Sequence, residues 1–194
     1  MRIITKHLQK NKYTRSGIRL NSLKGLVIHW TNSATDNFSR DFEWLFQFLN
    51  VNRPVNEKYA SYHYAIDQVG TVYELIPPTE CAWHGGPSNQ TDPDIEKQLG
   101  GKPNWNTLGI CFLHPTPDGK PTLSSYNALV ELCYYLIKEH KIPAQNLLRH
   151  HDCTGKNCPK YFVENQSEWN SFRRNVYSKL AQDGITKNTF HFAP

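Results

Sequence analysis

The alternation of apolar and polar residues divides the chain into strands, helices and loops. Short apolar runs rich in β-branched residues predict buried strands at 25–30 and 108–114, with a shorter strand at 146–148. The alternating run 61–67, the turn 68–70 and the returning run 71–76 predict a β-hairpin. Apolar residues at helical spacing predict helices at 38–49 and 124–140, and a last helix capped by Ser167 that extends to Leu180.

The stretch 77–106 breaks this periodicity. It contains five prolines and reads as a long irregular segment with one short helix, capped by Asp92 and carrying Pro93 in its first turn. Loops of this length inside a compact domain are usually functional, so we expect it to form one wall of a substrate cleft.

The order of these elements predicts an α/β fold in a single domain, with a central mixed β-sheet flanked by helices. A chain of 194 residues is long enough for one domain with a full core. We divide it into a polar lead-in at 1–23, the main domain at 24–163, and a C-terminal helix and tail at 164–194 that pack on that domain. The sequence shows no internal repeat and no second module.

Composition supports a globular protein, since 38% of residues are hydrophobic and 20% are charged. The net charge of +5 suits an anionic partner, such as cell wall bearing teichoic acid, or nucleic acid. A nucleic-acid groove would need a long basic run interleaved with aromatic residues, which the sequence lacks, so we expect no nucleic-acid partner. The five cysteines are odd in number and unevenly spaced, which favours a reduced compartment over a disulfide framework.

Residues 1–17 are polar and basic and contain no apolar stretch of signal-peptide length. No segment approaches the length of a membrane span, so we expect no membrane partner. The sequence therefore predicts synthesis in the cytoplasm without a signal peptide. Any role outside the cell would then require release by lysis, by a holin or by another route that bypasses the general secretion pathway.

The densest chemistry lies at 149–159, Arg-His-His-Asp-Cys-Thr-Gly-Lys-Asn-Cys-Pro. Thr154 and Gly155 in its middle predict a loop rather than a helix. A polar surface loop with incidental cysteines is one interpretation. The other is a zinc-ligand loop, because His150 and Cys158 are eight residues apart and a bent loop can direct both at one ion. Lys156 would then stand beside the metal without binding it.

A catalytic zinc site needs three protein ligands and one open position. His29, at the end of the predicted strand 25–30, is the candidate third ligand. A histidine at the end of a buried strand can also be a hydrogen-bonded core residue, and that interpretation stands beside the first.

With these residues in view, the chain resembles the zinc-dependent N-acetylmuramoyl-L-alanine amidases of the type 2 amidase and peptidoglycan-recognition-protein family. The likeness spans roughly residues 24–162. It rests on motifs in the expected order, namely Val-Ile-His-Trp-Thr at 27–31, Ser-Tyr-His-Tyr at 61–64, Trp-His-Gly-Gly at 83–86, Asn-Thr-Leu-Gly-Ile at 106–110, and the segment from His150 to Cys158 and Pro159.

The resemblance implies one Zn²⁺ per chain, held by His29, His150 and Cys158, and the eight-residue spacing selects His150 over His151. It implies that Lys156 is catalytic and stabilises the oxyanion. One branch of the family uses a glutamate after the Gly-Ile of the third strand, where this chain has Cys111.

The other branch, which includes small phage amidases and catalytic peptidoglycan recognition proteins, uses a tyrosine on the hairpin strand, and Tyr62 has that place here. The resemblance therefore assigns the chain to this phage lysozyme-like branch. A phenol has an unperturbed pKa near 10, so we favour an orienting role for Tyr62, and the group that takes the proton is left open.

Further site residues follow from the same resemblance. Trp83, His84 and Asn106 are candidate substrate contacts, although His84 could equally be a plain surface histidine. His151 and Asp152 are candidates for orienting the metal ligands, against the alternative of simple solvent exposure. His63 is expected on the opposite face of its strand from Tyr62, in a structural role.

The implied activity is hydrolysis of the amide bond between the lactyl group of N-acetylmuramic acid and L-alanine in peptidoglycan, by a monomeric phage or prophage endolysin. Peptidoglycan or muropeptides would be its partner. The alternatives are a non-catalytic peptidoglycan-binding module, a bacterial autolysin and a muropeptide-recycling amidase. A structural zinc knuckle for nucleic acid would need four closed ligands and a basic aromatic surface.

Overall fold

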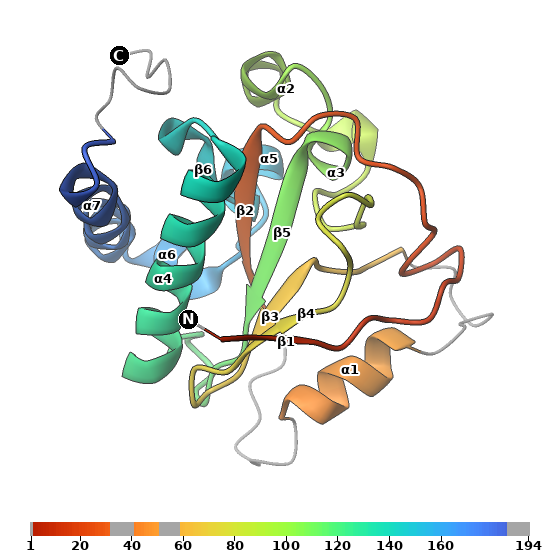
Figure 1. The fold of residues 1–194 in the computed structure, drawn as a ribbon, viewed down its shortest axis with the longest axis horizontal. Helices are drawn as coiled ribbons and strands as arrows, with labels where there is room; N and C mark the ends of the chain where they lie inside the picture. Colours follow the sequence, from red (N-terminus) through yellow and green to blue (C-terminus); the bar gives the residue numbers. More distant parts are fainter. Residues whose placement is uncertain (1, 32–40, 51–58, 186–194) are drawn as a thin grey trace.

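A six-stranded mixed sheet runs through the part of the protein described by this computed structural model, which comprises residues 2–31, 41–50 and 59–185 (Figure 1). The strand order is β1-β4-β3-β5-β2-β6. Neighbouring strands are parallel except for the antiparallel β3–β4 hairpin. The predicted mixed sheet flanked by helices is therefore confirmed. The strands are β1 (Ile3–Thr5), β2 (Gly25–Trp30), β3 (Tyr64–Ile66), β4 (Val72–Glu74), β5 (Thr107–Phe112) and β6 (Leu147–Arg149).

The described residues also form three longer helices and several short ones, of which α5, α6 and α7 follow the last strand. The longer helices are α1 (Phe42–Asn50), α4 (Leu123–His140) and α7 (Gln166–Gln182). The short elements are η1 (Ser88–Gln90), α2 (Pro93–Leu99), α3 (Pro103–Asn106), η2 (Ala144–Asn146), α5 (His150–Thr154) and α6 (Lys160–Glu164). The predicted cap of α2 is confirmed, because the Asp92 carboxylate accepts hydrogen bonds from the N–H groups of Asp94 and Ile95.

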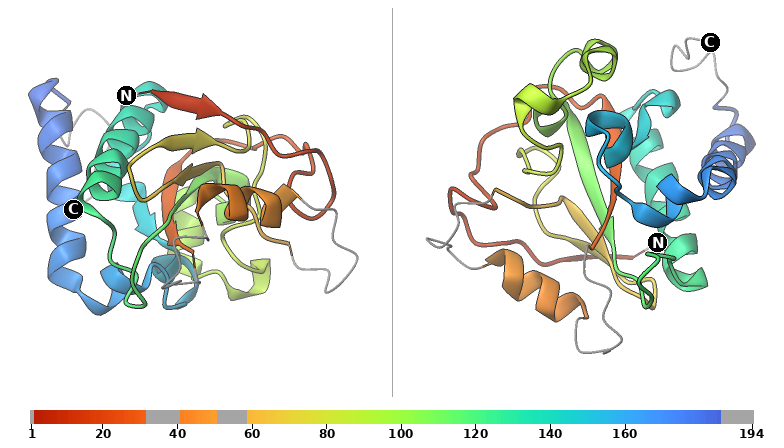
Figure 2. Two further views of the ribbon diagram at one scale, coloured as in Figure 1. Left: turned by 90° about the horizontal axis from the view of Figure 1, so that it is seen from below. Right: turned by 180° about the vertical axis from the view of Figure 1, so that it is seen from behind.

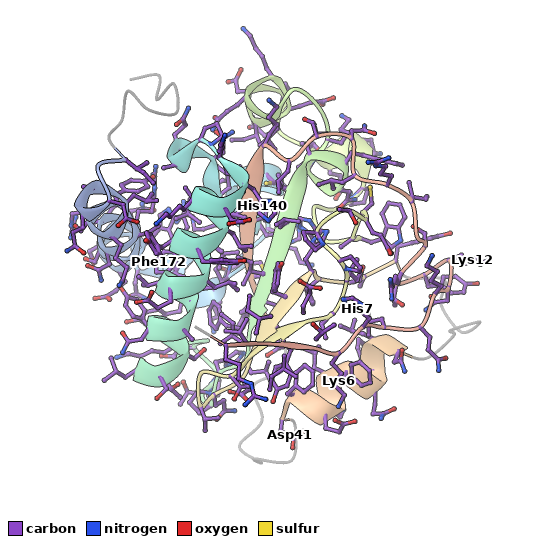
Figure 3. The ribbon with its side chains drawn as sticks, viewed as in Figure 1. Lys6, His7, Lys12, Asp41, His140 and Phe172 are labelled. Atoms are coloured by element: carbon purple, nitrogen blue, oxygen red, sulfur yellow. The ribbon has the colours of Figure 1, made fainter. Side chains whose placement is uncertain are left out.

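One face of the sheet is covered by α4 and α7, which lie side by side (Figure 2). The main hydrophobic core lies here, because alternate residues of β2 and β5, such as Leu26, Ile28 and Ile110, face α4. Phe172 of α7 lies between the two helices (Figure 3), with its ring centroid 5.8 Å from that of Tyr126 on α4. This apolar layer makes the sheet a rigid platform.

The opposite face is covered in two separate places. At one end, α1 packs against Ala65 and the residues that follow β4. At the other end, α2 and α5 pack over Val27 and Leu148. Polar side chains at the carboxyl end of β2 lie between these two clusters, and this arrangement positions the site described below.

The structure departs from the sequence-based expectations at several elements. The lead-in contributes an edge strand, β1, which pairs with β4. Helix α7 begins two residues earlier than predicted and has Asn165, not Ser167, as its N-cap. The expected helix at 38–49 is described from Phe42 onwards, and Phe38 lies outside the described residues. Among the helices that the structure describes, none is long and apolar enough to cross a membrane.

The segment 149–159, predicted to be a loop throughout, contains the one-turn helix α5. A reciprocal cap explains the error, because the Asp152 carboxylate accepts a hydrogen bond from the Arg149 N–H at 2.7 Å. Gly155 ends the turn in the left-handed conformation, with φ of 73°. The glycine was thus a helix-ending signal rather than a sign that the whole segment is irregular.

Candidate metal centre

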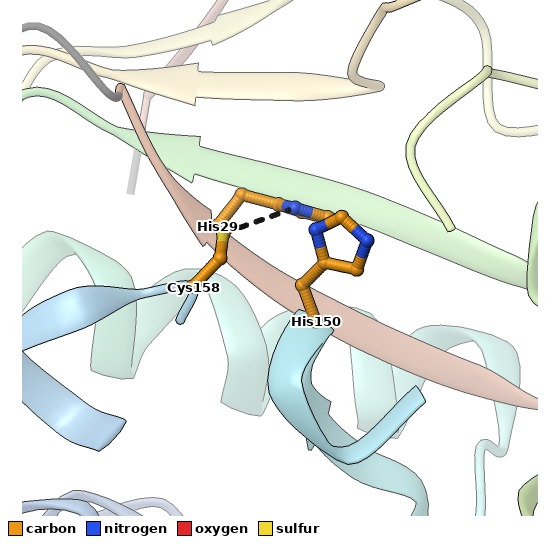
Figure 4. A group of neighbouring side chains, drawn as sticks. All are labelled: His29, His150 and Cys158. Atoms are coloured by element: carbon orange, nitrogen blue, oxygen red, sulfur yellow. Dashed lines mark hydrogen bonds between the residues drawn. The ribbon is translucent and has the colours of Figure 1, made fainter. Parts of the chain in front are cut away.

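Three potential metal-binding side chains converge at the carboxyl end of β2 (Figure 4). One ligand atom from each of His29, His150 and Cys158 lies within 4.8 Å of the other two. The side chains are buried, with exposed fractions of 2%, 7% and 5% respectively. The structure thus brings together the three residues that the resemblance implied as ligands.

The register of the sheet places the two histidines next to each other. Strands β2 and β6 are parallel neighbours, and Ile28 is paired with Arg149. His29 follows Ile28 in β2, and His150 follows Arg149 directly after β6. The two histidines therefore lie at the same edge of the sheet. The carboxyl ends of parallel strands are a common position for binding sites in α/β folds.

An ion pair between buried Arg149 and half-buried Asp152 holds α5 at this edge. The Arg149 guanidinium donates to the Asp152 carboxylate at 2.7 Å and to the Phe162 carbonyl at 2.9 Å. It also lies over the Trp169 ring of α7, 5.4 Å from the centroid. These contacts connect the segment that carries His150 to the C-terminal helices. Asp152, expected to orient a ligand, acts on this segment through Arg149.

Backbone hydrogen bonds hold the turn after α5, so that Cys158 lies next to the start of this helix. The His151 N–H donates to the Cys158 carbonyl at 2.8 Å, and the Cys158 N–H donates to the Lys156 carbonyl at 2.7 Å. The His151 ring, half-buried, has Nδ1 3.2 Å from the same Lys156 carbonyl. Its contacts are therefore with the turn that presents Lys156 and Cys158. Cys153, in contrast, is buried in a separate apolar cluster with Val27 and Leu148.

Burial sets the protonation of the three candidate ligands. It lowers the pKa of His29 well below its usual value, and the charges of His150, His84 and Lys156 add to the effect. Burial and the Lys156 charge together lower the pKa of His150 to about 4. Burial raises the pKa of the Cys158 thiol to about 11. Two neutral imidazoles with available lone pairs, and a thiol that a bound cation would deprotonate, form a donor set that fits a zinc ion.

The three residues lie at the floor of a cleft of about 820 Å³. Its wall includes four other residues singled out from the sequence, namely Tyr62, Trp83, His84 and Lys156. Lys156 is close enough to His29 and His150 to depress the pKa of both rings. The Tyr62 ring centroid lies 5.2 Å from that of His29.

Tyr62 contacts the residue that occupies the glutamate position of the other family branch. Cys111 is paired with His29 across β2 and β5, and its thiol is close enough to Tyr62 to influence the pKa of the phenol. Burial, followed by the nearby Cys111 and Cys158, raises the pKa of Tyr62 well above its usual value. The phenol therefore remains protonated at neutral pH.

His84 is buried beside His29, and His63 is buried next to His84, with the His63 and His84 ring centroids 5.7 Å apart. His63 accepts a hydrogen bond from the Gly109 N–H at Nδ1 and approaches the Glu80 carbonyl with Nε2, each at 2.9 Å. Its structural role fits these contacts, and the strand is shorter than predicted, because β3 begins only at Tyr64 and includes neither Tyr62 nor His63. Both ring nitrogens of His84 also face protein atoms, although the residue lines the cleft, and its expected substrate contact stays a prediction.

Asn106 does not belong to the cleft, although the sequence placed it among the substrate contacts. It is buried, with an exposed fraction of 4%, and its amide nitrogen lies 3.4 Å from the Leu99 carbonyl and from the Ser22 hydroxyl. It ends α3 immediately before β5. Asn106, in the motif at 106–110, therefore packs the junction between α3 and β5.

Sequence reasoning missed several residues of the site. Asn104 holds the Trp-His-Gly-Gly segment, because its side-chain oxygen accepts hydrogen bonds from the N–H groups of His84 and Gly85 at 2.9 and 2.6 Å. Tyr59 lines the cleft beside Trp83, with ring centroids 5.9 Å apart. The contact between Asn104 and the glycine-rich motif could not be predicted from the sequence, because the two segments are about 20 residues apart and meet only in the fold.

Comparison with known proteins was consistent with this geometry. Residues 19–161 match the model of a family described as N-acetylmuramoyl-L-alanine amidase. A probable N-acetylmuramoyl-L-alanine amidase of Bacillus licheniformis is 29% identical over 187 residues, covering 96% of this chain and 50% of the relative. The amidase BlyA of Bacillus subtilis strain 168 is 30% identical over 192 residues, covering 93% of this chain and 48% of the relative. The chain thus spans about half the length of the curated relatives it matches.

Solved structures share the fold. The catalytic domain of XlyA superposes with a TM-score of 0.69 at 22% identity, covering 91% of this chain and 99% of that one. The structure of PlyL superposes with a TM-score of 0.68 at 21% identity, covering 91% of this chain and 97% of that one. At this identity the similarity supports the architecture rather than any particular substrate.

Proposed function

The chain belongs to the N-acetylmuramoyl-L-alanine amidase family, and on that premise we propose that it hydrolyses the amide bond between the lactyl group of N-acetylmuramic acid and L-alanine in peptidoglycan. The observation that carries the proposal is the convergence of His29, His150 and Cys158 on the floor of one cleft that also contains Lys156 and Tyr62. A purely structural metal site would be closed by a fourth protein ligand. Among the described residues, the metal-binding group has three members and opens into the cleft.

We propose that the three residues hold one Zn²⁺. When bound, zinc would supply a Lewis acid that polarises the substrate carbonyl and lowers the pKa of a water molecule. The chain supplies the rest of the site. Burial keeps the imidazoles neutral, and the rigid sheet edge fixes where they point.

The ammonium group of Lys156 would stabilise the negative charge that develops on the carbonyl oxygen. Tyr62 would donate a hydrogen bond to the reacting amide or to the attacking water, because its raised pKa keeps the hydroxyl protonated. A phenol in this state does not remove a proton. Tyr62 therefore orients a reactant, and Trp83 contributes an aromatic wall for the substrate.

We propose that the protein acts as a phage or prophage endolysin, after synthesis in the cytoplasm and release to the cell wall as a monomer. The net charge of +5 favours approach to an anionic wall. A bacterial autolysin or a muropeptide-recycling amidase would use the same cleft. Digestion of intact walls compared with soluble muropeptides distinguishes a wall-degrading enzyme from a recycling one.

The test combines metal analysis with digestion of purified peptidoglycan, in which new ends are identified by mass spectrometry. We expect one zinc per chain and free L-alanine amino ends that disappear with a chelator and return with zinc. His29→Ala, His150→Ala and Cys158→Ala should each remove both zinc and activity. Zinc without new ends from either substrate would favour a binding module, and full activity in any ligand variant would refute the proposed ligand set.

A further inference from the structure

The His84 ring joins the candidate metal ligand His29 to a backbone carbonyl of β5. His84 Nδ1 lies 3.1 Å from His29 Nε2, and His84 Nε2 lies 3.3 Å from the Thr107 carbonyl oxygen. The other ring nitrogen of His29, Nδ1, lies 3.6 Å from the Cys158 sulfur. The two histidines therefore form a chain of contacts that runs from β5 to the metal-binding atoms.

The position of each proton in this series of contacts can be worked out from the Thr107 end. The Thr107 carbonyl can only accept a hydrogen bond. The Thr107 hydroxyl, 3.5 Å from His84 Nε2, donates its own proton to the Pro103 carbonyl at 2.7 Å and can likewise only accept from the ring. His84 Nε2 must therefore carry the proton.

A neutral His84 ring then has a lone pair at Nδ1, which faces His29. The contact at 3.1 Å is a hydrogen bond only if His29 Nε2 carries a proton. A neutral His29 with its proton on Nε2 has its lone pair on Nδ1, and this atom faces Cys158. The alternative tautomer of His29, with its proton on Nδ1, would direct an N–H at the metal position. The lone pairs of His29 Nε2 and His84 Nδ1 would then face each other without a proton between them.

We infer that His84 is a positioning residue: it selects the tautomer of His29 that directs the Nδ1 lone pair at the metal position. The inference rests on the proposed zinc site and assigns a role to a residue outside the metal-binding group. Partners of this kind orient metal-binding imidazoles and increase their basicity.

The surroundings of His84 are built to hold the ring in this place. Asn104 fixes its backbone through the hydrogen bonds described above, and its amide nitrogen donates to the Gly86 carbonyl at 3.2 Å. Gly109 of β5 lies directly under the ring, where an added Cβ would be 2.6 Å from His84 Cγ. The glycine therefore provides the space that the ring occupies, and Gly109→Ala should displace it.

The experiment compares zinc dissociation constants, measured by competition with a chromophoric chelator, across matched variants of the full chain. His84→Leu removes the acceptor and should weaken zinc binding by roughly 10- to 100-fold, as does the loss of comparable partners of metal ligands. His84→Asn, which keeps an acceptor oxygen near the Nδ1 position, should recover part of that loss. Gly109→Ala should weaken binding in the same direction as His84→Leu.

Asn146→Leu is the control for a general loss of buried hydrogen bonds. Asn146 is buried to a similar extent, with an exposed fraction of 2%, and its amide contacts the Lys24 carbonyl at the opposite end of β2. This variant should lose stability while keeping the zinc affinity of the wild type. Equal losses of zinc affinity in Asn146→Leu and His84→Leu would overturn the inference.

A direct readout is the nitrogen-15 NMR spectrum of histidine-labelled, zinc-loaded protein. We expect the His29 proton on Nε2, in slow exchange with solvent, and faster exchange in His84→Leu. A proton on Nδ1 of His29, or a His84→Leu affinity within about threefold of the wild type, would overturn the inference and leave the metal centre intact. A wild-type protein without zinc affinity would overturn the metal centre and the inference together.

Discussion

At the scale of single residues, Lys156 places a positive charge next to the candidate ligands without belonging to the metal-binding group. Lys156→Ala should therefore retain zinc, while the rate falls by about 100- to 1,000-fold, as it does on removal of one oxyanion donor. Zinc content and initial rates of peptidoglycan digestion measure the two effects. Lys97→Ala, an exposed lysine on α2, is the matched control. An unchanged rate in Lys156→Ala would exclude this residue from the mechanism.

Tyr62 gives a second prediction at this scale. Because its pKa is raised well above the usual value, it cannot titrate as a base near neutrality. Tyr62→Phe should lower the rate by about 10- to 100-fold, the range for a hydrogen bond to a group of developing charge, without moving the alkaline limb of the pH–rate profile. A profile that loses this limb in Tyr62→Phe would show that the phenol itself titrates and would contradict the orienting role.

At the scale of elements, the junction of β6 and α5 carries one ligand and depends on a single ion pair. Arg149 and Asp152 have side-chain exposures of 10% and 22%, and the same guanidinium binds the Phe162 carbonyl. Removal of one partner leaves the other charge poorly compensated in a largely buried place. We therefore expect stability and metal affinity to be coupled at this junction.

Asp152→Ala should lower the free energy of unfolding by about 2–4 kcal/mol and weaken zinc binding at the same time. Denaturant unfolding and the chelator competition measure these two quantities. Asp183→Ala breaks an exposed pair with Lys138 at 2.7 Å and serves as the control, with a small effect on stability and none on zinc affinity. Loss of stability in Asp152→Ala with unchanged zinc affinity would show that the ion pair does not contribute to metal binding.

At the scale of the whole molecule, the described fold buries several histidines in neutral form, and His63 shows the consequence for pH dependence. Burial lowers its pKa from about 6.5 in the unfolded chain to about 4 in the folded protein. Below about pH 6.5 the unfolded chain binds a proton that the folded protein does not, so stability must fall as the pH decreases towards about 4.

Across that interval His63 should account for about 3 kcal/mol of lost stability, since each pKa unit corresponds to about 1.4 kcal/mol. His63→Gln should therefore show a shallower decline of the free energy of unfolding between about pH 6.5 and pH 4. Denaturant titrations at several pH values in this window compare the two slopes. Equal slopes in the two proteins would mean that folding does not lower the pKa of His63.

The extent to which the sequence predicts this protein also depends on scale. Helices α4 and α7 were predictable, because the period of their apolar residues records which face is buried. Strands β2 and β5 were predictable because a short, nearly unbroken apolar run is typical of a strand buried on both faces. Strand β1 and helix α5 were not, because three residues at a sheet edge and one capped turn are too short to show a period. Asn106 was misassigned because a motif does not reveal whether a polar residue faces a cleft or a junction.

By itself, the sequence determined the fold class and the candidate chemistry, since both depend on residue type and local spacing: apolar periodicity, and the eight residues between His150 and Cys158. Tertiary structure decided the contacts between distant segments. The register of β2 against β6 set His29 beside His150, and the space above Gly109 set His84 between His29 and Thr107. Such contacts depend on strand register and side-chain direction, which no local pattern encodes.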